Sequence, residues 1–203
     1  MSKTFFDFES GDLSLDFANT KSWHASQKSV EHLSSYADIV TWGQEADLIT
    51  AALAHQILNQ AAEQPEKASN AYDHAILFRE ALYNIYSSLY AREPVPPDDL
   101  ALVNSIARKA MAGLELVSER TKFRWEWTPG ISGIDTILWP VARAAAELLT
   151  SDKLLRVREC EDDRGCGTLF IDQSKNHSRR WCSMDSCGNR AKARRHQAKI
   201  QST

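Results

Sequence analysis

The chain lacks any apolar run that approaches the length of a membrane span, and its first 159 residues contain no cysteine. A spanning helix needs about 20 predominantly apolar residues, so the sequence predicts no membrane segment. With only 8 Gly, 6 Pro and 4 Cys among 203 residues, the composition excludes a collagen-like repeat, a disulfide-dense scaffold and a wholly disordered chain. The N-terminus also lacks the apolar core of a secretory signal. We therefore expect a cytoplasmic protein whose thiols stay reduced.

Net charge is also small. The chain holds 24 basic and 27 acidic residues, a formal charge of −3, which by itself argues against a polyanionic partner. The two signs are unevenly distributed, however. Residues 1–150 contain 12 basic and 20 acidic residues, whereas residues 151–203 contain 12 and 7, so the balances are −8 and +5. A basic segment on an acidic body indicates contact with nucleic acid or, alternatively, a solvated tail that aids solubility.

Apolar spacing predicts a mainly α fold with small β elements. We expect two domains, a mainly helical one over residues 1–151 and a small zinc-ribbon-like module over residues 152–203. Alternating apolar residues near the N-terminus predict hairpin-like strands at 5–8 and 13–17. A second hairpin is predicted near 114–127, where Phe123, Trp125 and Trp127 alternate with charged residues. Apolar residues spaced three and four apart predict helices over residues 33–44, 50–62, 65–92, 98–114 and 134–149.

The chain has no phosphate-binding loop, dinucleotide fingerprint or nucleophile elbow. We therefore do not expect an enzyme.

All four cysteines fall in the C-terminal quarter, in two close pairs separated by fifteen residues: Cys160, Cys166, Cys182 and Cys187. Two such pairs can converge on one tetrahedral metal ion, and four thiolates leave no open position, which is typical of structural zinc. One zinc ion, contributing about 10–16 kcal/mol, would stabilise a segment too small to bury a core. Four unrelated thiols and an iron–sulfur cluster are the alternatives. His177 and His196 are second-rank candidate ligands.

Basic residues surround the last cysteine pair. Asn189 is a good helix N-cap, and the residues that follow it favour a helix from about residue 190 to 201 with little apolar face. Phosphates would be natural partners for such a helix. Reversing the charge of Arg190, Arg194 and Arg195 should then abolish salt-sensitive binding while zinc stays in place. The candidate nucleic-acid contacts are Lys175, Arg179, Arg180, Asn189, Arg190, Lys192, Arg194 and Arg195.

These residues also carry a family resemblance. Residues 180–190 read RWCSMDSCGNR and resemble the signature of the CGNR zinc-finger family, which is named after its CGNR tetrapeptide, here Cys187 to Arg190. Residues 11–20, GDLSLDFANT, resemble the opening motif of the ABATE domain, which precedes this finger in bacterial proteins. The resemblance implies a DNA-binding zinc-ribbon-like finger on a stress-induced transcription regulator.

The body offers a candidate ligand pocket. Several polar residues lie close together in the opening motif, and two arginines interrupt apolar helical faces. Together they could recognise a small polar or anionic effector; turn-locking and ordinary ion pairs are the alternative roles. The candidate pocket residues are Asp16, Asn19, Trp23, Arg79 and Arg143.

We therefore expect a bacterial transcription regulator that binds DNA through its finger and whose N-terminal domain senses a ligand or dimerises. Modest positive charge on one finger favours a homodimer. An RNA-binding zinc ribbon is the first alternative, because a basic helix suits both nucleic acids. A protein-interaction ribbon and an enzyme that uses the N-terminal polar cluster are further alternatives.

Overall fold

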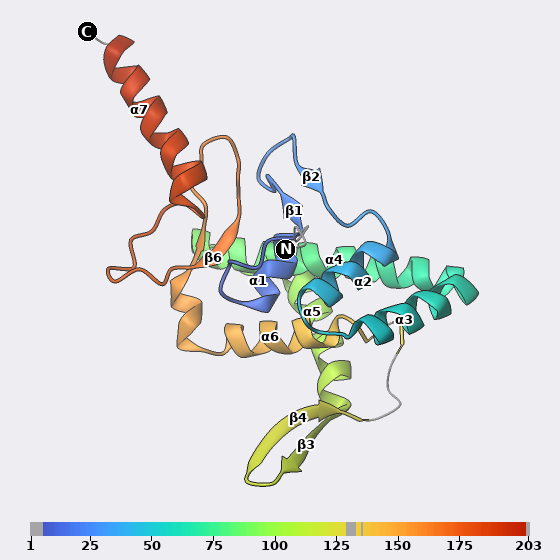
Figure 1. Ribbon diagram of the computed structural model, residues 1–203. Helices are drawn as coiled ribbons and strands as arrows, with labels where there is room; N and C mark the ends of the chain where they lie inside the picture. Colours follow the sequence, from blue (N-terminus) through green and yellow to red (C-terminus); the bar gives the residue numbers. More distant parts are fainter. Residues whose placement is uncertain (1–5, 129–132, 135, 202–203) are drawn as a thin grey trace.

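The computed structural model describes residues 6–128, 133–134 and 136–201. Helices form the body, and two segments project from it in different directions (Figure 1). The mainly α class with small antiparallel strand pairs is confirmed. None of the described helices is long and apolar enough to span a bilayer.

The long helix α4 (Pro65–Ala91) runs through the body. Its buried face carries Phe78, Leu82 and Ile85 at the spacing that the sequence predicts. Around it pack α1 (Leu13–Ala18), α2 (Tyr36–Glu45), α3 (Ala51–Glu63) and α5 (Pro97–Ala112). Helix α6 (Trp139–Leu149) packs against α1 and α5 and closes the core. This core holds the surfaces on which the C-terminal segment rests.

Three short antiparallel pairs complete the fold of the described residues. Strands β1 (Lys21–Ser22) and β2 (Val30–Glu31) border a loop beside α4. Strands β3 (Leu114–Glu119) and β4 (Lys122–Trp127) form the predicted hairpin, which projects from the end of α5 (Figure 1). Strands β5 (Val157–Glu159) and β6 (Leu169–Ile171) lie in the C-terminal segment.

The predicted N-terminal strands are wrong. Leu13 to Phe17 forms helix α1, and residues 7–9 have no regular structure; Phe5 lies outside the described residues. Asp12 is extended and its carboxylate accepts a hydrogen bond from the Ser14 amide at 2.9 Å, so it caps a helix rather than continuing a strand. Leu15 and Phe17 are both fully buried because the body surrounds this short helix. Alternating apolar residues therefore arise here without a strand.

The other predicted helices are present with shifted ends. Ser35 caps α2 and Thr50 caps α3, each through its hydroxyl. Helix α6 begins at Trp139 rather than 134, because Pro140 favours the first turn.

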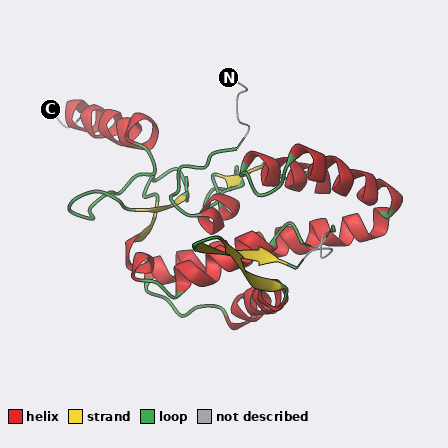
Figure 2. Cartoon of the chain, turned by 60° about the horizontal axis from the view of Figure 1, so that its bottom comes forward, coloured by secondary structure: helices red, strands yellow, loops and turns green. Residues whose placement is uncertain are grey.

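The C-terminal segment continues through the 3-10 turn η1 (Asp152–Arg156), β5 and β6, then the π-helical turn η2 (Met184–Gly188) and α7 (Asn189–Gln201). Val157, Leu169 and Ile171 are buried in the same apolar core as the body. The base of the segment is thus joined to the body by packing, while α7 points away from it (Figures 1 and 2).

Candidate metal centre and nucleic-acid interface

The four cysteines meet at one point beside β6. Their sulfur atoms all lie within 4.8 Å of one another, with 3.8 Å between Cys166 and Cys182 and 3.7 Å between Cys182 and Cys187. Four sulfurs at about 2.3 Å from a tetrahedral zinc ion lie about 3.8 Å apart. The spacing therefore suits one structural zinc ion. Cys160, Cys166 and Cys187 are buried and Cys182 is partly exposed.

The four thiols lie close enough to shift one another's pKa values. Hydrogen bonds from Cys160 and Cys182 lower the pKa of Cys166 well below its ordinary value. Hydrogen bonds with the Cys160 and Cys166 thiols raise the pKa of Cys182. Burial, and secondarily the negative charge of Cys166, raise the pKa of Cys187 to about 12. A bound dication would favour the thiolate form of all four cysteines.

Glycines bring the backbone around the second cysteine close to the body. Gly165 and Gly167 have φ values of +84° and +66°. A Cβ at Gly165 would lie 2.8 Å from the Ala25 carbonyl oxygen, and one at Gly167 would lie 2.6 Å from the Tyr83 hydroxyl. A side chain at either position would push the turn around Cys166 away from the β1–β2 loop.

Two tryptophans cover the cysteine cluster. Trp23, from the β1–β2 loop, and Trp181 both pack against it together with Phe170. The sequence assigns Trp23 to the body's ligand pocket, but its ring lies 5.1 Å from the Arg164 guanidinium and 5.3 Å from that of Arg190. The N-terminal region thus supplies part of the cover over the metal site.

A buried carboxylate organises the arginines that follow the last cysteine. The Asp162 side chain is fully buried and pairs with Arg190 at 3.1 Å and with Arg194 at 3.2 Å. Burial alone would raise its pKa, but hydrogen bonds from the Arg164 amide and the surrounding groups hold that pKa at about 2. Arg190 also donates to the Cys187 sulfur at 2.7 Å. Arg190 and Arg194 therefore neutralise a buried carboxylate beside the metal site, so reversing their charge would perturb Asp162 as well as any phosphate contact.

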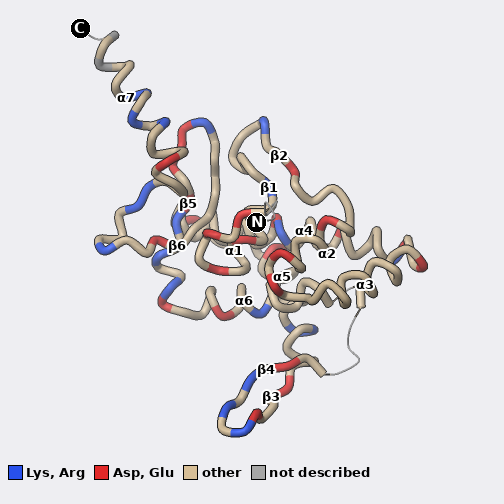
Figure 3. Tube along the Cα trace, in the orientation of Figure 1, with Lys and Arg blue, Asp and Glu red and all other residues tan. Residues whose placement is uncertain are grey.

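The remaining predicted contacts divide into held and exposed side chains. Arg179 donates to the carbonyls of Trp181 and Cys182 and lies 4.5 Å above the Phe170 ring. Arg180 is exposed and pairs with Glu161 at 2.5 Å. The side chains that are exposed and have no carboxylate partner among the described residues are Lys175, Lys192 and Arg195. Figure 3 shows basic residues along α7 and the loop before it.

Asn189 is not an N-cap. Its backbone is helical, with φ −66° and ψ −38°, because η2 runs directly into α7. Its amide donates to the Asp185 carbonyl at 3.4 Å. The turn begins at Met184, after the extended Ser183. The helix is therefore built outward from the metal-bound turn rather than started by a polar cap.

Neither histidine belongs to the metal cluster within the described ranges. His177 lies in the loop before Arg179, with its Nδ1 atom 3.3 Å from the Asp172 carbonyl oxygen. His196 is exposed on α7.

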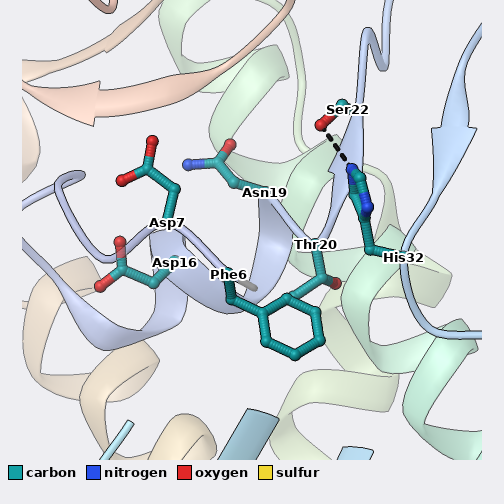
Figure 4. A pocket seen from close by; sticks show the side chains of 7 residues that line it. All are labelled: Phe6, Asp7, Asp16, Asn19, Thr20, Ser22 and His32. Atoms are coloured by element: carbon teal, nitrogen blue, oxygen red, sulfur yellow. Dashed lines mark hydrogen bonds between the residues drawn. The ribbon is translucent and has the colours of Figure 1, made fainter. Parts of the chain in front are cut away.

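Asp16 and Asn19 line a cavity of about 170 Å³ with Asp7, Thr20 and His32 (Figure 4). Burial raises the pKa of Asp16 to about 6, despite the bond from Ser10. Of the polar or anionic effectors that the sequence suggests, two carboxylates favour a polar hydrogen-bond donor and disfavour an anion; they also suit a cation.

Arg79 and Arg143 do not line this cavity. Arg79 is 1% exposed and is held by Glu31 at 2.5 Å and Glu80 at 2.7 Å. Arg143 pairs with Glu147 at 2.7 Å and lies 5.8 Å from the Trp125 ring. Both arginines are accounted for by structural contacts.

Asn19 has a role that the sequence does not indicate. Its amide donates to the Leu169 carbonyl at 2.8 Å, and its Oδ1 accepts from the Leu169 amide at 2.9 Å. The Ser10 carbonyl accepts from the Ile171 amide at 2.8 Å. Asn19 of the opening motif and the neighbouring Ser10 therefore hydrogen-bond to the backbone of β6. In the sequence, the only indication that this segment matters is its resemblance to a family motif.

Comparison with known families agrees with this architecture. Residues 11–152 match the ABATE family, whose description is "Putative stress-induced transcription regulator", and residues 156–199 match the CGNR zinc finger. No curated protein matches the chain. Neither family description names a catalytic activity. The ABATE match covers well over half of the chain. The chain therefore belongs to the ABATE family and carries a CGNR zinc finger.

Proposed function

We propose that this member of the ABATE family is a cytoplasmic transcription regulator that binds DNA through exposed cations on α7. The observation that carries this proposal is the difference between the held and the exposed cations of this helix. Asp162 engages Arg190 and Arg194, whereas Lys192 and Arg195 stand exposed one turn apart on the projecting helix. Phosphate contacts would supply the partner that packing does not.

The helix has the dimensions for such contact. Its 13 residues span about 20 Å, and the zinc-bound turn at its base sets its direction. The exposed chain around it contributes Lys175 as a further cation, and Arg180 there already pairs with Glu161. Together these features favour a basic surface anchored at one end and open to a phosphate backbone at the other.

The test is a matched pair of charge reversals in the zinc-loaded chain. Lys192→Glu/Arg195→Glu should reduce the slope of log affinity against log salt for duplex DNA by about 1.8, at about 0.9 per lost phosphate contact. Arg108→Glu/Lys153→Glu makes the same charge change at exposed positions away from α7 and should keep the wild-type slope. Equal slopes in both variants would refute this surface. Tighter binding to structured RNA than to duplex DNA would favour the RNA-binding alternative.

We further propose that the body senses a small donor or cation in the Asp16 cavity. The polar lining and the adjacent Asn19–Leu169 bonds support this role, because an occupant would lie next to the contact that holds the finger. A panel of small amines and amides should raise the melting temperature at pH 7.5, where Asp16 is ionised. The shift should fall at pH 5, below its pKa of about 6, and in Asp16→Asn. No shift with any probe would count against sensing here.

A further inference from the structure

The β3–β4 hairpin exposes a large apolar face. Leu116, Phe123 and Trp125 are 57%, 69% and 50% exposed. Leu116 lies opposite Trp125 in the register, so these side chains share one face. Contiguous apolar surface of this kind on a projecting segment marks an interaction site.

The hairpin also has an unpaired edge at β4 in the described ranges. The Thr128 amide donates to the Gly113 carbonyl at 2.9 Å, which fixes the alternation of the ladder. Even-numbered residues of β4 therefore bond to β3, while the amides and carbonyls of Phe123, Trp125 and Trp127 point outward. This edge can accept another strand.

Charge selects the strand that fits. Strand β4 carries Lys122 and Arg124 together with Glu126, whereas the charged residues of β3 are only Glu115 and Glu119. Pairing β3 with its own copy brings no opposite charges together. Strand β4 can pair opposite charges with a copy of itself. Arg124 and Glu126 already pair within one chain, so two copies would form a cluster of four alternating charges.

Only one centre of symmetry in β4 pairs opposite charges and also avoids every like-charge contact, because a centre at Trp127 would only set Glu126 against Thr128. With Trp125 on a two-fold axis, Arg124 of each chain faces Glu126 of the other, and Phe123 faces Trp127. Moving the centre to Arg124 places two arginines opposite each other, and moving it to Glu126 does the same with two glutamates. A centre at Phe123 sets Lys122 against Arg124. With the axis at Trp125, the outward backbone groups of the two Trp125 residues bond reciprocally.

We infer that two copies of this chain pair through β4 in antiparallel register about Trp125, forming a four-stranded sheet. The sheet would join the two apolar faces and close with two-fold symmetry. This deepens the dimerising role suggested for the N-terminal domain, but it does not rest on DNA binding.

The test is sedimentation of the zinc-loaded full chain over a concentration series without nucleic acid. The wild type should be a dimer of the 22.8 kDa chain. Arg124→Glu and Glu126→Arg should each raise the dimer dissociation constant roughly tenfold or more, since both cross-chain pairs become repulsive. Glu93→Arg makes a charge reversal at an exposed position in the loop after α4 and should leave the dimer unchanged. Circular dichroism checks that each variant is folded.

Mixing the two single variants gives the decisive measurement. In a heterodimer, the carboxylates at positions 124 and 126 of the Arg124→Glu chain face the guanidinium groups at positions 126 and 124 of the Glu126→Arg chain. Both cross-chain pairs are attractive again, so the equimolar mixture should regain wild-type association.

A monomeric wild type would overturn the inference. So would undiminished dimers in the single variants, failure of the mixture to associate, or open-ended assemblies that indicate pairing of β4 with β3. DNA binding by a monomer would leave the finger proposal standing while this one fails.

Discussion

Helix α7 and the β3–β4 hairpin both project from the same helical body, yet they differ in chemistry and in what holds them. The exposed residues of α7 are mainly polar or basic, and the helix is fixed at its base by η2 and the Asp162 ion pairs. The hairpin is held by its own ladder and, near its base, by Trp127 and by Arg143 beside Trp125, and it exposes large apolar side chains. A projecting segment without a packed face leaves its surface chemistry for a partner. Cations suit a polyanion, and an apolar β edge suits another strand.

The two segments also differ in how their bases are attached to the body. Order in α7 depends on four cysteines and a buried carboxylate, so it depends on a metal. The hairpin base is fixed by Trp127, whose indole donates to the Ala110 carbonyl at 3.1 Å and whose ring lies 6.5 Å from that of Trp139. This contrast predicts that the two segments can be lost separately.

Removing zinc should give the largest difference between the two segments, because it should disorder α7 and leave the hairpin folded. A structural zinc ion contributes about 10–16 kcal/mol, more than a small segment recovers by packing. Chelation should abolish hydrogen-exchange protection in residues 160–167, in residues 181–188 and in α7, together with DNA binding, while β6 keeps its packing against the body. Protection of β3 and β4, and the sedimentation of the dimer, should not change. Joint loss of protection in the hairpin and α7 would show that the segments depend on one another.

The sequence predicts the features that rest on regular spacing, such as helix faces and the cysteine pairs. It does not predict individual long-range contacts between side chains. Periodic apolar residues locate α4 and α5, because a face that recurs over several turns must be buried. The cysteine spacing locates the metal site for the same reason, since four soft ligands have few other uses together. Asp162 lies in a run of acidic residues that resembles a solvated surface, and only the folded chain brings Arg190 and Arg194 to it.

Helix α1 and Asn19 show the other limit of sequence reasoning. A six-residue helix is too short for its period to differ from that of a strand, so its alternating leucines misled the prediction. Asn19 bonds across 150 residues of sequence to Leu169. Its role depends on where β6 lies, and no local pattern contains that position.

Asn19→Ala should produce a smaller effect, confined to the finger's base. It removes both bonds to the Leu169 backbone, whose residue is fully buried. Two unpaired backbone groups at about 1–3 kcal/mol each predict a loss of roughly 2–6 kcal/mol in the free energy of unfolding. Zinc content and the hairpin dimer should stay at wild-type values, because the cysteines and β4 do not contact Asn19 through any of these bonds. Urea denaturation of the zinc-loaded chain measures the loss.

Asn59→Ala is the matched control, because Asn59 is exposed on α3 and bonds only to His55 among the contacts described for it. Its loss should stay within about 0.5 kcal/mol, as for an ordinary surface substitution. If the two variants unfold at the same urea concentration, the Asn19–Leu169 pair contributes nothing beyond a surface contact. The finger would then be held to the body by its other contacts, such as the packing of Val157, Leu169 and Ile171 and the bond from Ile171 to Ser10. The coupling between cavity and finger would lose its physical basis.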